Sequence, residues 1–505
     1  MIQPPAAGDS MPEWLRQRAH LSPDRLALVF EDERWTFAEL DRRVSGAAGR
    51  LTVAGVEPEN LVALLARNGS GFAQLVHAVP RLGAVLVPLN VRLTTDELAW
   101  QLRDSGAKFL VSDEPNAANA AELKKSLPSL SCLSLAELTE HDDTERLDVG
   151  EERVSLSAVH SVIYTSGTSG RPKGAMLTFG NHLWSALGSA LNLGLRSDDR
   201  WLACMPLFHV GGLAILLRSV IYGSTAVVQE SFDPDTVNRA IDEDAITTVS
   251  VVSAMLSRML EARGERSYPE TLRCVLAGGG PLPRRLLEEC VRRSVPVVQT
   301  YGLTEAASQV ATLSPEDAPL KLGSAGRPLF ATEIRIVDEQ GRTLPAGEAG
   351  EIVVRGPTVT SGYLNDIEAT ARALRDGWLH TGDIGHLDEE GLLYVLDRRD
   401  DLIVSGGENV YPAEVEEVLR SHPAVLDAAV VGLPDERWGR RVAAAVALRP
   451  GSEPDEEELL TFCRNHLASY KTPTQLRIVE QLPRNAAGKL LRRAVRDEWP
   501  KDELR

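Results

Sequence analysis

The chain has 505 residues, of which 43% are hydrophobic and 25% are charged, as in an ordinary globular protein. This length exceeds what one compact core usually holds, so we expect two or more domains. Asp and Glu outnumber Lys and Arg by 72 to 54, and the formal net charge is -18. That balance disfavours general binding to nucleic acid or to an anionic membrane, while a small polyanion stays compatible if local cations screen it.

Neither the cysteines nor the first residues indicate a secreted protein. The five cysteines are scattered, without a CxxC pair or a Cys/His cluster, which indicates reduced thiols in a cytoplasmic protein. No basic segment followed by an apolar one begins the chain, so no secretory signal is predicted. The apolar stretch at 61–89 is interrupted by Arg67, Asn68, His77 and Arg81, short of the roughly 18 apolar residues of a membrane span. We therefore expect no membrane insertion.

The N-terminal part alternates helix-like and strand-like segments. Residues 41–54 have helical spacing, and short apolar runs predict buried strands at 61–65, 84–88 and 108–111. Such alternation is typical of α/β layers. Residues 114–153 are polar and irregular, so we interpret them as a variable connection.

The alternation of helix-like and strand-like segments then resumes, and the sequence pattern changes after residue 323. Short strands between Gly, Pro and Asp turns predict a small β-rich subdomain there. The predicted fold class is α/β: a large N-terminal domain (1–399) of layered α/β subdomains plus this β-rich subdomain, then a small mobile α+β C-terminal domain (400–505). The later predicted strands are 158–164, 226–228, 247–252, 273–276, 295–298, 333–337, 351–355, 392–396, 428–431, 443–448 and 476–479, and the later predicted helices are 413–421 and 455–467.

The strongest motif is Tyr164-Thr-Ser-Gly-Thr-Ser-Gly-Arg-Pro-Lys-Gly174, directly after a strand-like run. Its glycines and hydroxyls suit the wrapping of a phosphate chain by backbone N–H and side-chain donors, and Lys173 adds positive charge. The spacing is not that of a Walker A loop. The alternative is an exposed flexible loop, which the Pro-Lys-Gly ending disfavours. The predicted phosphate contacts are Thr165, Ser166, Gly167, Thr168, Ser169 and Gly170.

This string resembles the phosphate loop of the adenylate-forming superfamily, which includes acyl-CoA synthetases, peptide-synthetase adenylation domains and luciferases. The motif Tyr301-Gly302-Leu-Thr304-Glu305 is similar to a second motif of that superfamily. The resemblance implies that Thr304 contacts phosphate and that Glu305 holds Mg²⁺, an ion that takes one or two carboxylates plus phosphate oxygens. Taken alone, Glu305 would be interpreted as a solvated glutamate at the start of a helix.

Further motifs resemble those that bind the nucleoside. Thr381-Gly-Asp383 and Asp397-Arg398 are similar to the ribose motifs, which implies that Asp383 accepts from both hydroxyls and that Arg398 donates to them. Charged groups make the stronger hydrogen bonds such an anchor needs. Alone, either motif reads as a turn aspartate or a surface ion pair. The glycines Gly278, Gly279 and Gly280 resemble the adenine-binding turn, where the lack of a side chain lets backbone lie flat on a base.

The C-terminal part resembles the mobile domain of the superfamily. Lys489 would stabilise the charge that develops when a carboxylate attacks the α-phosphate, and Asp400 occupies the hinge position. Without the resemblance, Lys489 belongs to a solvated basic helix face. Ser405-Gly-Gly-Glu-Asn409 resembles the segment that approaches the thiol of coenzyme A. The implied contacts with coenzyme A are Gly406, Gly407, Trp438 and Lys471, the last at a phosphate.

Several segments resemble o-succinylbenzoate–CoA ligases in particular, among them 179–182, 206–209, 299–309 and 322–329. The resemblance implies an enzyme of menaquinone biosynthesis that uses ATP, Mg²⁺ and coenzyme A. This acid has two carboxylates, and burying one unpaired is costly.

The roles expected for the acid follow from that cost. His209 would gate the acid, Ser308 and Gln309 would line its pocket, and Arg218 would offset the second charge. The alternative for Arg218 is a surface helix residue.

Other functions stay open at this point. The nearest is another acyl-CoA synthetase, acting on an aryl, malonyl or medium-chain acid. A standalone enzyme that loads a carrier-protein arm, a catalytically silent nucleotide-binding or scaffold protein, and a luciferase-like oxygenase are further alternatives. We expect small-molecule substrates and no nucleic acid, and the sequence leaves open a monomer or a homo-oligomer.

Overall fold

A computed structural model describes residues 10–140, 150–166, 171–279, 282, 284–338, 340–397, 403–410, 412–483 and 492–500. The chain divides into two compact units. The predicted domain boundary at residue 400 lies outside the described residues and stays a prediction. Unit 1 comprises Met1–Val91, Leu102–Ile163 and Gly174–Leu396, and unit 2 comprises Arg92–Gln101, Tyr164–Lys173 and Asp397–Arg505.

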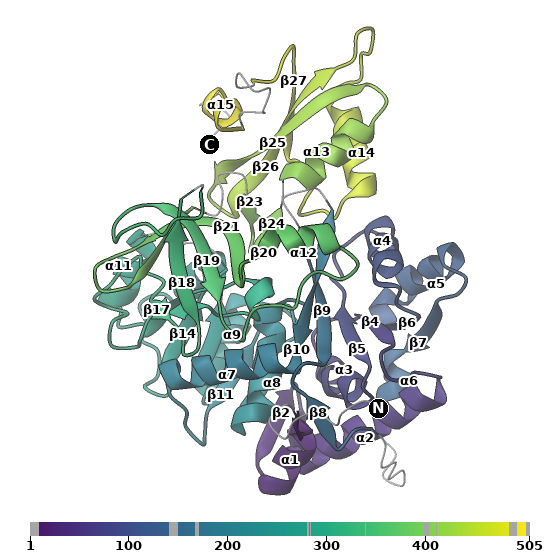
Figure 1. Cartoon of the computed structure of the whole chain (residues 1–505), viewed down its shortest axis with the longest axis vertical. Coiled ribbons are helices and arrows are strands. Elements are labelled where there is room, and N and C mark those ends of the chain that lie inside the picture. The colour runs from purple at the N-terminus through teal and green to yellow at the C-terminus, as the bar shows by residue number, and fades with distance from the viewer. Residues whose placement is uncertain are drawn as a thin grey trace. The chain divides into compact units, whose positions relative to one another are not determined.

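A six-stranded sheet begins the layered part of the fold (Figure 1). Its inner strands are short, apolar and parallel, as expected for a sheet covered on both faces. The strands predicted at 61–65, 84–88 and 108–111 are thereby confirmed. In spatial order the strands are β10 (Pro172–Thr178), β9 (Val159–Ser166), β5 (Val85–Pro88), β4 (Leu61–Leu65), β6 (Phe109–Ser112) and β7 (Ser131–Ser134).

A nine-stranded sheet carries two of the predicted nucleotide motifs, 278–280 after β14 and 301–305 at the end of β15. Its central strands are parallel, and the last pairs at either end are antiparallel. The strands predicted at 226–228, 247–252, 273–276 and 295–298 all belong to it. In spatial order the strands are β17 (Arg327–Pro328), β16 (Ala311–Thr312), β15 (Val297–Tyr301), β14 (Cys274–Ala277), β13 (Thr248–Val251), β11 (Arg200–Ala203), β12 (Thr225–Val228), β2 (Leu26–Phe30) and β3 (Glu33–Thr36).

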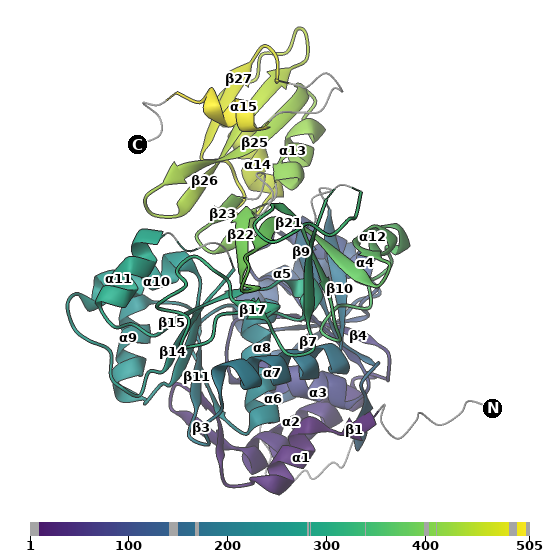
Figure 2. The same ribbon diagram turned by 60° about the vertical axis from the view of Figure 1, so that its left-hand side comes forward.

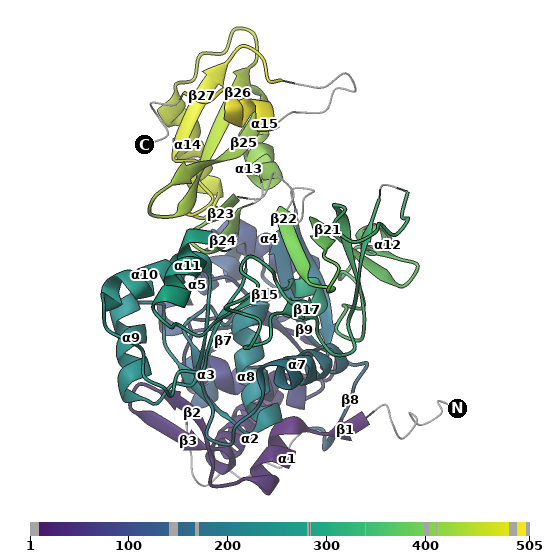
Figure 3. The ribbon, with the colours of Figure 1, turned by 90° about the vertical axis from the view of Figure 1, so that its left-hand side faces the viewer.

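The nine-stranded sheet separates two hydrophobic cores, and successive side chains of β11 point alternately into one and the other. Trp201 and Ala203 enter the core that this sheet shares with the six-stranded sheet, whereas Leu202 enters the core on the opposite face. The second core packs against α9, α10 and α11, which gather along one side of the sheet in Figures 2 and 3. The helices of unit 1 used below are α2 (Phe37–Val53), α3 (Ser70–Arg81), α7 (Phe179–Leu193), α8 (Val210–Tyr222), α9 (Pro234–Glu243), α10 (Ser253–Arg263), α11 (Arg284–Arg292) and α12 (Ile367–Ala373).

Two sequence expectations need correction. The helix predicted from residue 41 begins at Phe37, because Thr36 and Glu39 form a capping box in which each side chain binds the backbone N–H of the other. The stretch 114–153 is also more regular than predicted. Its small residues and short apolar runs form η1 (Glu114–Asn116), α5 (Ala117–Ser126), β7, α6 (Leu135–Thr139) and β8 (Arg153–Ser155).

The β-rich subdomain predicted after residue 323 is confirmed as a five-stranded antiparallel sheet of unit 1. The strand that carries the motif Thr381–Asp383 was not predicted, because glycine and polar residues interrupt its pattern. The strands are β18 (Glu333–Val337), β19 (Gly350–Arg355), β21 (Trp378–Leu387) and β20 (Leu374–Arg375), with β22 (Leu393–Asp397) paired to β21.

Unit 2 contains its own α+β core. Strands β25 and β26 form a long antiparallel pair whose alanines and valines pack against α13 and α14. The helices and strands predicted here are confirmed. The predicted ones are β25 (Val425–Asp435), β26 (Gly439–Leu448), β27 (Gln475–Val479), α13 (Pro412–Ser421) and α14 (Glu456–His466). The short elements β23 (Ile403–Ser405), β24 (Glu408–Val410) and α15 (Arg492–Asp497) were not predicted. Within the described ranges, no helix is long and apolar enough to cross a membrane.

Candidate functional site

The predicted phosphate loop connects β9 with its neighbour β10, which is an edge strand of the six-stranded sheet. Thr165 and Ser166 end β9, and Lys173 is the second residue of β10, where its side chain is half-buried. The loop residues Gly167, Thr168, Ser169 and Gly170 lie outside the described residues. Within unit 2, the Tyr164 phenol donates to the Gln101 carbonyl at 3.3 Å, which anchors the strand at the start of the loop.

A tight turn follows β15 and presents Glu305. Ala307 and Ser308 both have left-handed backbone, with φ of 51° and 96°. The turn leaves no room for a side chain at Gly302, where a Cβ would lie 1.6 Å from the Ser308 carbonyl oxygen. Strained backbone of this kind is common at functional sites. The turn therefore sets the half-buried Thr304 and Glu305 directly beyond the sheet edge.

The structure brings the motif 301–305 together with the predicted ribose motif 381–383. The Tyr301 phenol donates to Asp383 Oδ2 at 2.7 Å. The Asp383 N–H donates to Thr381 Oγ1 at 3.0 Å, and the Gly382 N–H donates to Glu351 Oε1 at 3.0 Å. Glu351 was missed by sequence reasoning, because its link to the turn spans two strands. Asp383 is thus held in place from β15 and from β19.

The predicted magnesium ligand Glu305 is also held by its surroundings. The Tyr363 phenol donates to Glu305 Oε1 at 2.9 Å, and the Thr360 N–H donates to the Glu305 carbonyl at 2.7 Å. Tyr363 is a second residue that sequence reasoning missed. Among the described residues, no group of three or more His, Cys, Asp or Glu side chains forms a metal cage. This arrangement fits Mg²⁺ held by one carboxylate and nucleotide phosphates.

The predicted adenine turn follows β14. Gly278 donates its N–H to the Val251 carbonyl at 3.1 Å, and a Cβ there would lie 2.8 Å from Thr300 Cγ2. Gly279 has φ of +77°, which glycine adopts at no steric cost. The local backbone therefore requires glycine at both positions, whether or not adenine binds there. Gly280 lies outside the described residues.

Arg218 is not a surface residue. It belongs to α8, and its relative exposure to solvent is 2%. Its Nη2 donates to Ser185 Oγ at 3.2 Å, and Ser185 Oγ donates to the Ala307 carbonyl at 2.6 Å. The guanidinium also lies over the Trp201 ring at 5.4 Å. In the part of the chain that the structure describes, no carboxylate lies within ion-pair distance of Arg218, and Nε has no partner.

The neighbouring histidine does not add a second charge. Burial and, to a smaller extent, Arg218 lower the pKa of His182 to about 3. Burial also lowers the pKa of Arg218 from its ordinary value, although a guanidinium stays charged in proteins. This buried region is therefore cationic near neutral pH, with its charge on Arg218.

The other predicted acid contacts occupy different settings. His209 is exposed at the start of α8, where its ring lies 4.6 Å from that of Phe208. Ser308 is half-buried in the strained turn. Gln309 is buried, and its Nε2 donates to Thr312 Oγ1 at 3.1 Å, so its amide group braces β15 against β16. Their roles toward an acid stay predictions.

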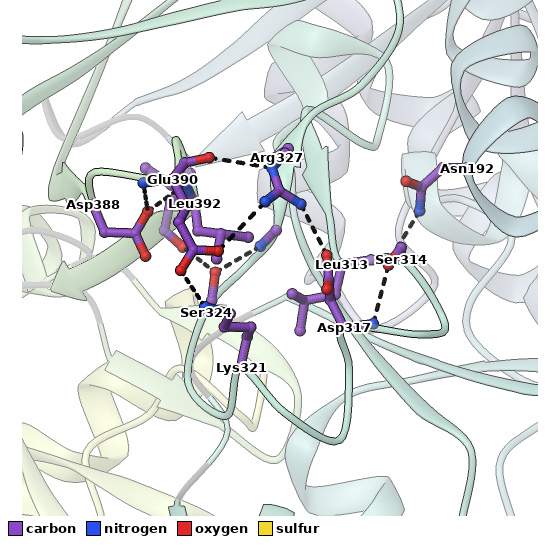
Figure 4. Close-up of polar contacts among 12 residues, drawn as sticks. Asn192, Leu313, Ser314, Asp317, Lys321, Ser324, Arg327, Asp388, Glu390 and Leu392 are labelled. Atoms are coloured by element: carbon purple, nitrogen blue, oxygen red, sulfur yellow. Dashed lines mark hydrogen bonds and ion pairs between the residues drawn. The ribbon is translucent and has the colours of Figure 1, made fainter.

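The segment 322–329, which was singled out by its resemblance to particular ligases, comprises the end of the loop between β16 and β17 and β17 itself, and polar contacts fix it (Figure 4). Arg327 forms ion pairs with Asp317 at 2.9 Å and with Glu390 at 3.7 Å, and Lys321 binds Glu390 at 2.6 Å. Ser324 Oγ donates to the Leu393 carbonyl at 3.0 Å. These contacts tie both halves of the loop to the hairpin between β21 and β22.

In unit 2 the predicted coenzyme A residues Gly406 and Trp438 lie together. Gly406 and Gly407 form the turn between β23 and β24, with φ of 58° and 87°. Gly406 donates its N–H to the Trp438 carbonyl at 3.0 Å, and a Cβ there would lie 2.6 Å from Trp438 Cε3. The indole of Trp438 is 42% exposed, which leaves it accessible to a ligand.

Lys471 is engaged by protein carboxylates in unit 2. Its Nζ lies 2.7 Å from Glu414 Oε1 and 2.9 Å from Glu97 Oε1, and its relative exposure is 3%. A contact with a phosphate of coenzyme A would require an exchange of these partners and stays a prediction. Three further predicted residues lie outside the described residues, namely Lys489, Arg398 and Asp400.

Comparison with known proteins gives a consistent result. Residues 15–364 match the AMP-binding enzyme family, and residues 414–489 match the AMP-binding enzyme C-terminal domain. The chain is 52% identical over 498 residues to the 2-succinylbenzoate–CoA ligase of Geobacillus kaustophilus (strain HTA426), covering 98% of this chain and 99% of the relative.

Two solved structures of the o-succinylbenzoate CoA synthetase MenE from Bacillus subtilis are 44% identical to this chain. A double mutant bound with its product analogue OSB-NCoA has a TM-score of 0.91 and covers 97% of this chain and 98% of its own. The complex with ATP and magnesium ion has a TM-score of 0.74, with coverage of 96% and 99%. The family match spans well over half of the chain, so the chain belongs to the AMP-binding enzyme family, in which the 2-succinylbenzoate–CoA ligases are among its similar relatives.

Proposed function

We propose that this enzyme joins o-succinylbenzoate to coenzyme A with MgATP, in the menaquinone biosynthesis of the cytoplasm. The observation that carries the choice of acid is Arg218, a buried cation without a carboxylate partner among the described residues. The names of the relatives support the same acid.

The two carboxylates of this acid have different needs. The aliphatic carboxylate reacts, whereas the aromatic one must enter the protein and be stabilised there. Burying a lone carboxylate costs several kcal/mol, and a guanidinium offers it a planar pair of N–H donors. Arg218 meets that need directly or through a water molecule, with Ser185 holding one of its nitrogens.

In the first half-reaction, the aliphatic carboxylate attacks the α-phosphate in line and releases pyrophosphate. Tyr301 and Asp383 hold the ribose, and Thr304 and the phosphate loop hold the triphosphate. Lys173 and Lys489 stabilise the charge that develops. Mg²⁺, when bound at Glu305, neutralises phosphate charge.

In the second half-reaction, the thiol of coenzyme A displaces AMP from the acyl carbon. The C-terminal domain turns about Asp400, withdraws Lys489 and presents Gly406, Gly407 and Trp438. His209 gates access of the acid. One site thereby serves two steps that need different groups.

The decisive experiment measures CoA-dependent AMP formation by the purified enzyme with o-succinylbenzoate, benzoate, malonate and a medium-chain acid. We expect AMP and a thioester only with o-succinylbenzoate. Benzoate lacks the reacting aliphatic carboxylate, and malonate and the medium-chain acid lack the aromatic one. Equal or faster turnover with any other acid would assign the enzyme to another acyl-CoA synthetase. Pyrophosphate release without thioester formation would instead indicate a carrier-protein-loading enzyme.

A further inference from the structure

We propose that Tyr363 is a positioning residue that orients the Glu305 carboxylate toward the metal ion of MgATP. The proposal concerns the nucleotide and its ion, so it holds whichever acid the enzyme uses. It starts from the hydrogen bond of 2.9 Å that the Tyr363 phenol donates to Glu305 Oε1.

The same short segment holds Glu305 at two points. Besides the phenol contact, the Thr360 N–H donates to the Glu305 carbonyl at 2.7 Å. Glu305 itself lies in a single turn of 3₁₀-helix between Thr304 and Ala306, followed by left-handed backbone. One segment therefore fixes both the main chain and the side chain of the predicted ligand.

The segment that carries Tyr363 is itself fixed against β10. The Leu364 N–H donates to the Gly174 carbonyl at 2.8 Å, and the Met176 N–H donates to the Gly362 carbonyl at 2.9 Å. Thr360 Oγ1 donates to the Met176 carbonyl at 2.6 Å. Because β10 is the strand that follows the phosphate loop in the chain, the position of Tyr363 is tied to the backbone that leaves this loop.

A second contact closes the segment on its other side. The Tyr363 N–H donates to Thr370 Oγ1 at 2.9 Å, from the start of α12. Gly362 has φ of +135°, and a Cβ there would lie 2.7 Å from Thr370 Cγ2, so only glycine lets the chain pass. The half-buried tyrosine therefore presents its hydroxyl from a rigid support.

The physical consequence concerns the free rotation of a carboxylate. A glutamate side chain has several rotatable bonds, and Mg²⁺ demands near-octahedral geometry at short distances. A carboxylate has about four lone-pair sites, so a phenol that donates to Oε1 restricts the rotation of the group while occupying only one of them. Groups that orient metal ligands in this way typically change metal affinity by about 10- to 100-fold.

The test is Tyr363→Phe, which removes the hydroxyl and keeps the ring. Calorimetric titration measures ATP binding to the full chain with excess Mg²⁺ and, separately, with EDTA, and Mn²⁺ electron paramagnetic resonance measures metal binding to the enzyme–ATP complex. We expect metal binding to weaken about 10- to 100-fold while metal-free ATP binding stays within about twofold of wild type. Unchanged metal binding, or an equal loss of metal-free ATP binding, would overturn the proposal.

A matched control variant and a double-mutant cycle distinguish an effect on the orientation of Glu305 from a general effect on the structure. Tyr268→Phe removes a phenol hydrogen bond of the same 2.9 Å length, to Asn238, and should leave metal binding unchanged. In a Glu305→Gln background, Tyr363→Phe should add less than about twofold, because the ligand it orients is already lost. Full additivity of the two substitutions would show that Tyr363 acts elsewhere, against the proposal.

Discussion

Arg218 in unit 1 and Lys471 in unit 2 are both almost fully buried cations, yet their surroundings are opposite. Lys471 contacts two carboxylates, Glu97 and Glu414, at ordinary ion-pair distances. Arg218 contacts a hydroxyl and an aromatic face, with no carboxylate among its described neighbours. A buried charge is tolerated only when something compensates it. The protein supplies that compensation for Lys471, and we infer that a ligand supplies it for Arg218.

This contrast distinguishes a structural cation from one reserved for binding. Removal of a structural cation leaves buried carboxylates unpaired and should destabilise the fold. Removal of a reserved cation takes away an uncompensated charge, so the fold should tolerate it while ligand binding suffers. The two outcomes can be measured separately, as the free energy of unfolding and as the KM for the acid.

The largest expected effect is that of Lys471→Met on stability. The substitution leaves Glu97 and Glu414 close together without their cation, and burial already raises the pKa of Glu414. We expect urea unfolding of the full chain to lose about 3–5 kcal/mol. Lys321→Met is the control, since its partner Glu390 is more than half exposed and the pair should contribute under about 1 kcal/mol. If both variants lose equally little, the contrast with Arg218 fails.

The pH dependence of the same variant sharpens this result. Burial acts to lower the pKa of Lys471, but Tyr470, Glu414 and Glu97 outweigh it and raise the pKa above the ordinary 10.5. The folded state therefore holds this proton more tightly than the unfolded state, so the stabilisation is complete below pH 10.5 and is lost as pH rises through the folded pKa. Above neutral pH, the stability difference between wild type and Lys471→Met should accordingly shrink only in strong alkali. In acid, the difference should also shrink as the Glu414 carboxylate, whose pKa burial raises, is protonated.

The next effect is that of Arg218→Ala on binding of the acid. Loss of one partner of a buried charge pair costs about 2–5 kcal/mol, so we expect a large rise in the KM for o-succinylbenzoate and an unchanged KM for ATP. Stability without ligand should fall by less than for Lys471→Met, because the side chain removed has no protein counter-charge. Arg218→Lys keeps the charge but loses the planar fork, and should recover only part of the affinity. An unchanged KM for the acid would refute the role.

The sequence allowed some of this to be anticipated. Strands β4, β12 and β18 were predictable because continuous or alternating apolar runs identify them directly. The burial of Arg218 also left a signal, since it is the one charged residue in an otherwise apolar helix of 13 residues, and such a helix is buried on all sides. The sequence still allowed Arg218 to be interpreted as a surface residue, because its burial follows from the packing of α8 against β11, β12 and neighbouring helices.

Other features depend on contacts far apart in the chain. Tyr363 and Glu305 are separated by 58 residues, and Lys471 and Glu97 by 374, so no local pattern could pair them. Glu351 contacts the turn at Gly382 only because β19 and β21 are neighbours in the sheet. Family motifs indicated the residues that we propose as nucleotide contacts, whereas the residues that hold those in place required the fold.

The smallest expected effect is that of Glu390→Ala, which tests whether exposure alone explains the contrast. Glu390 binds both Lys321 and Arg327, but the three side chains are between 29% and 55% exposed, so solvent already compensates their charges. We expect a loss of about 0.2–1 kcal/mol in urea unfolding and a small rise in the KM for the acid, because the loop that carries 322–329 becomes less constrained. High salt should reduce the difference from wild type, since exposed charges are screened. A loss as large as that of Lys471→Met would mean that the number of partners, and not burial, decides how much a cation contributes.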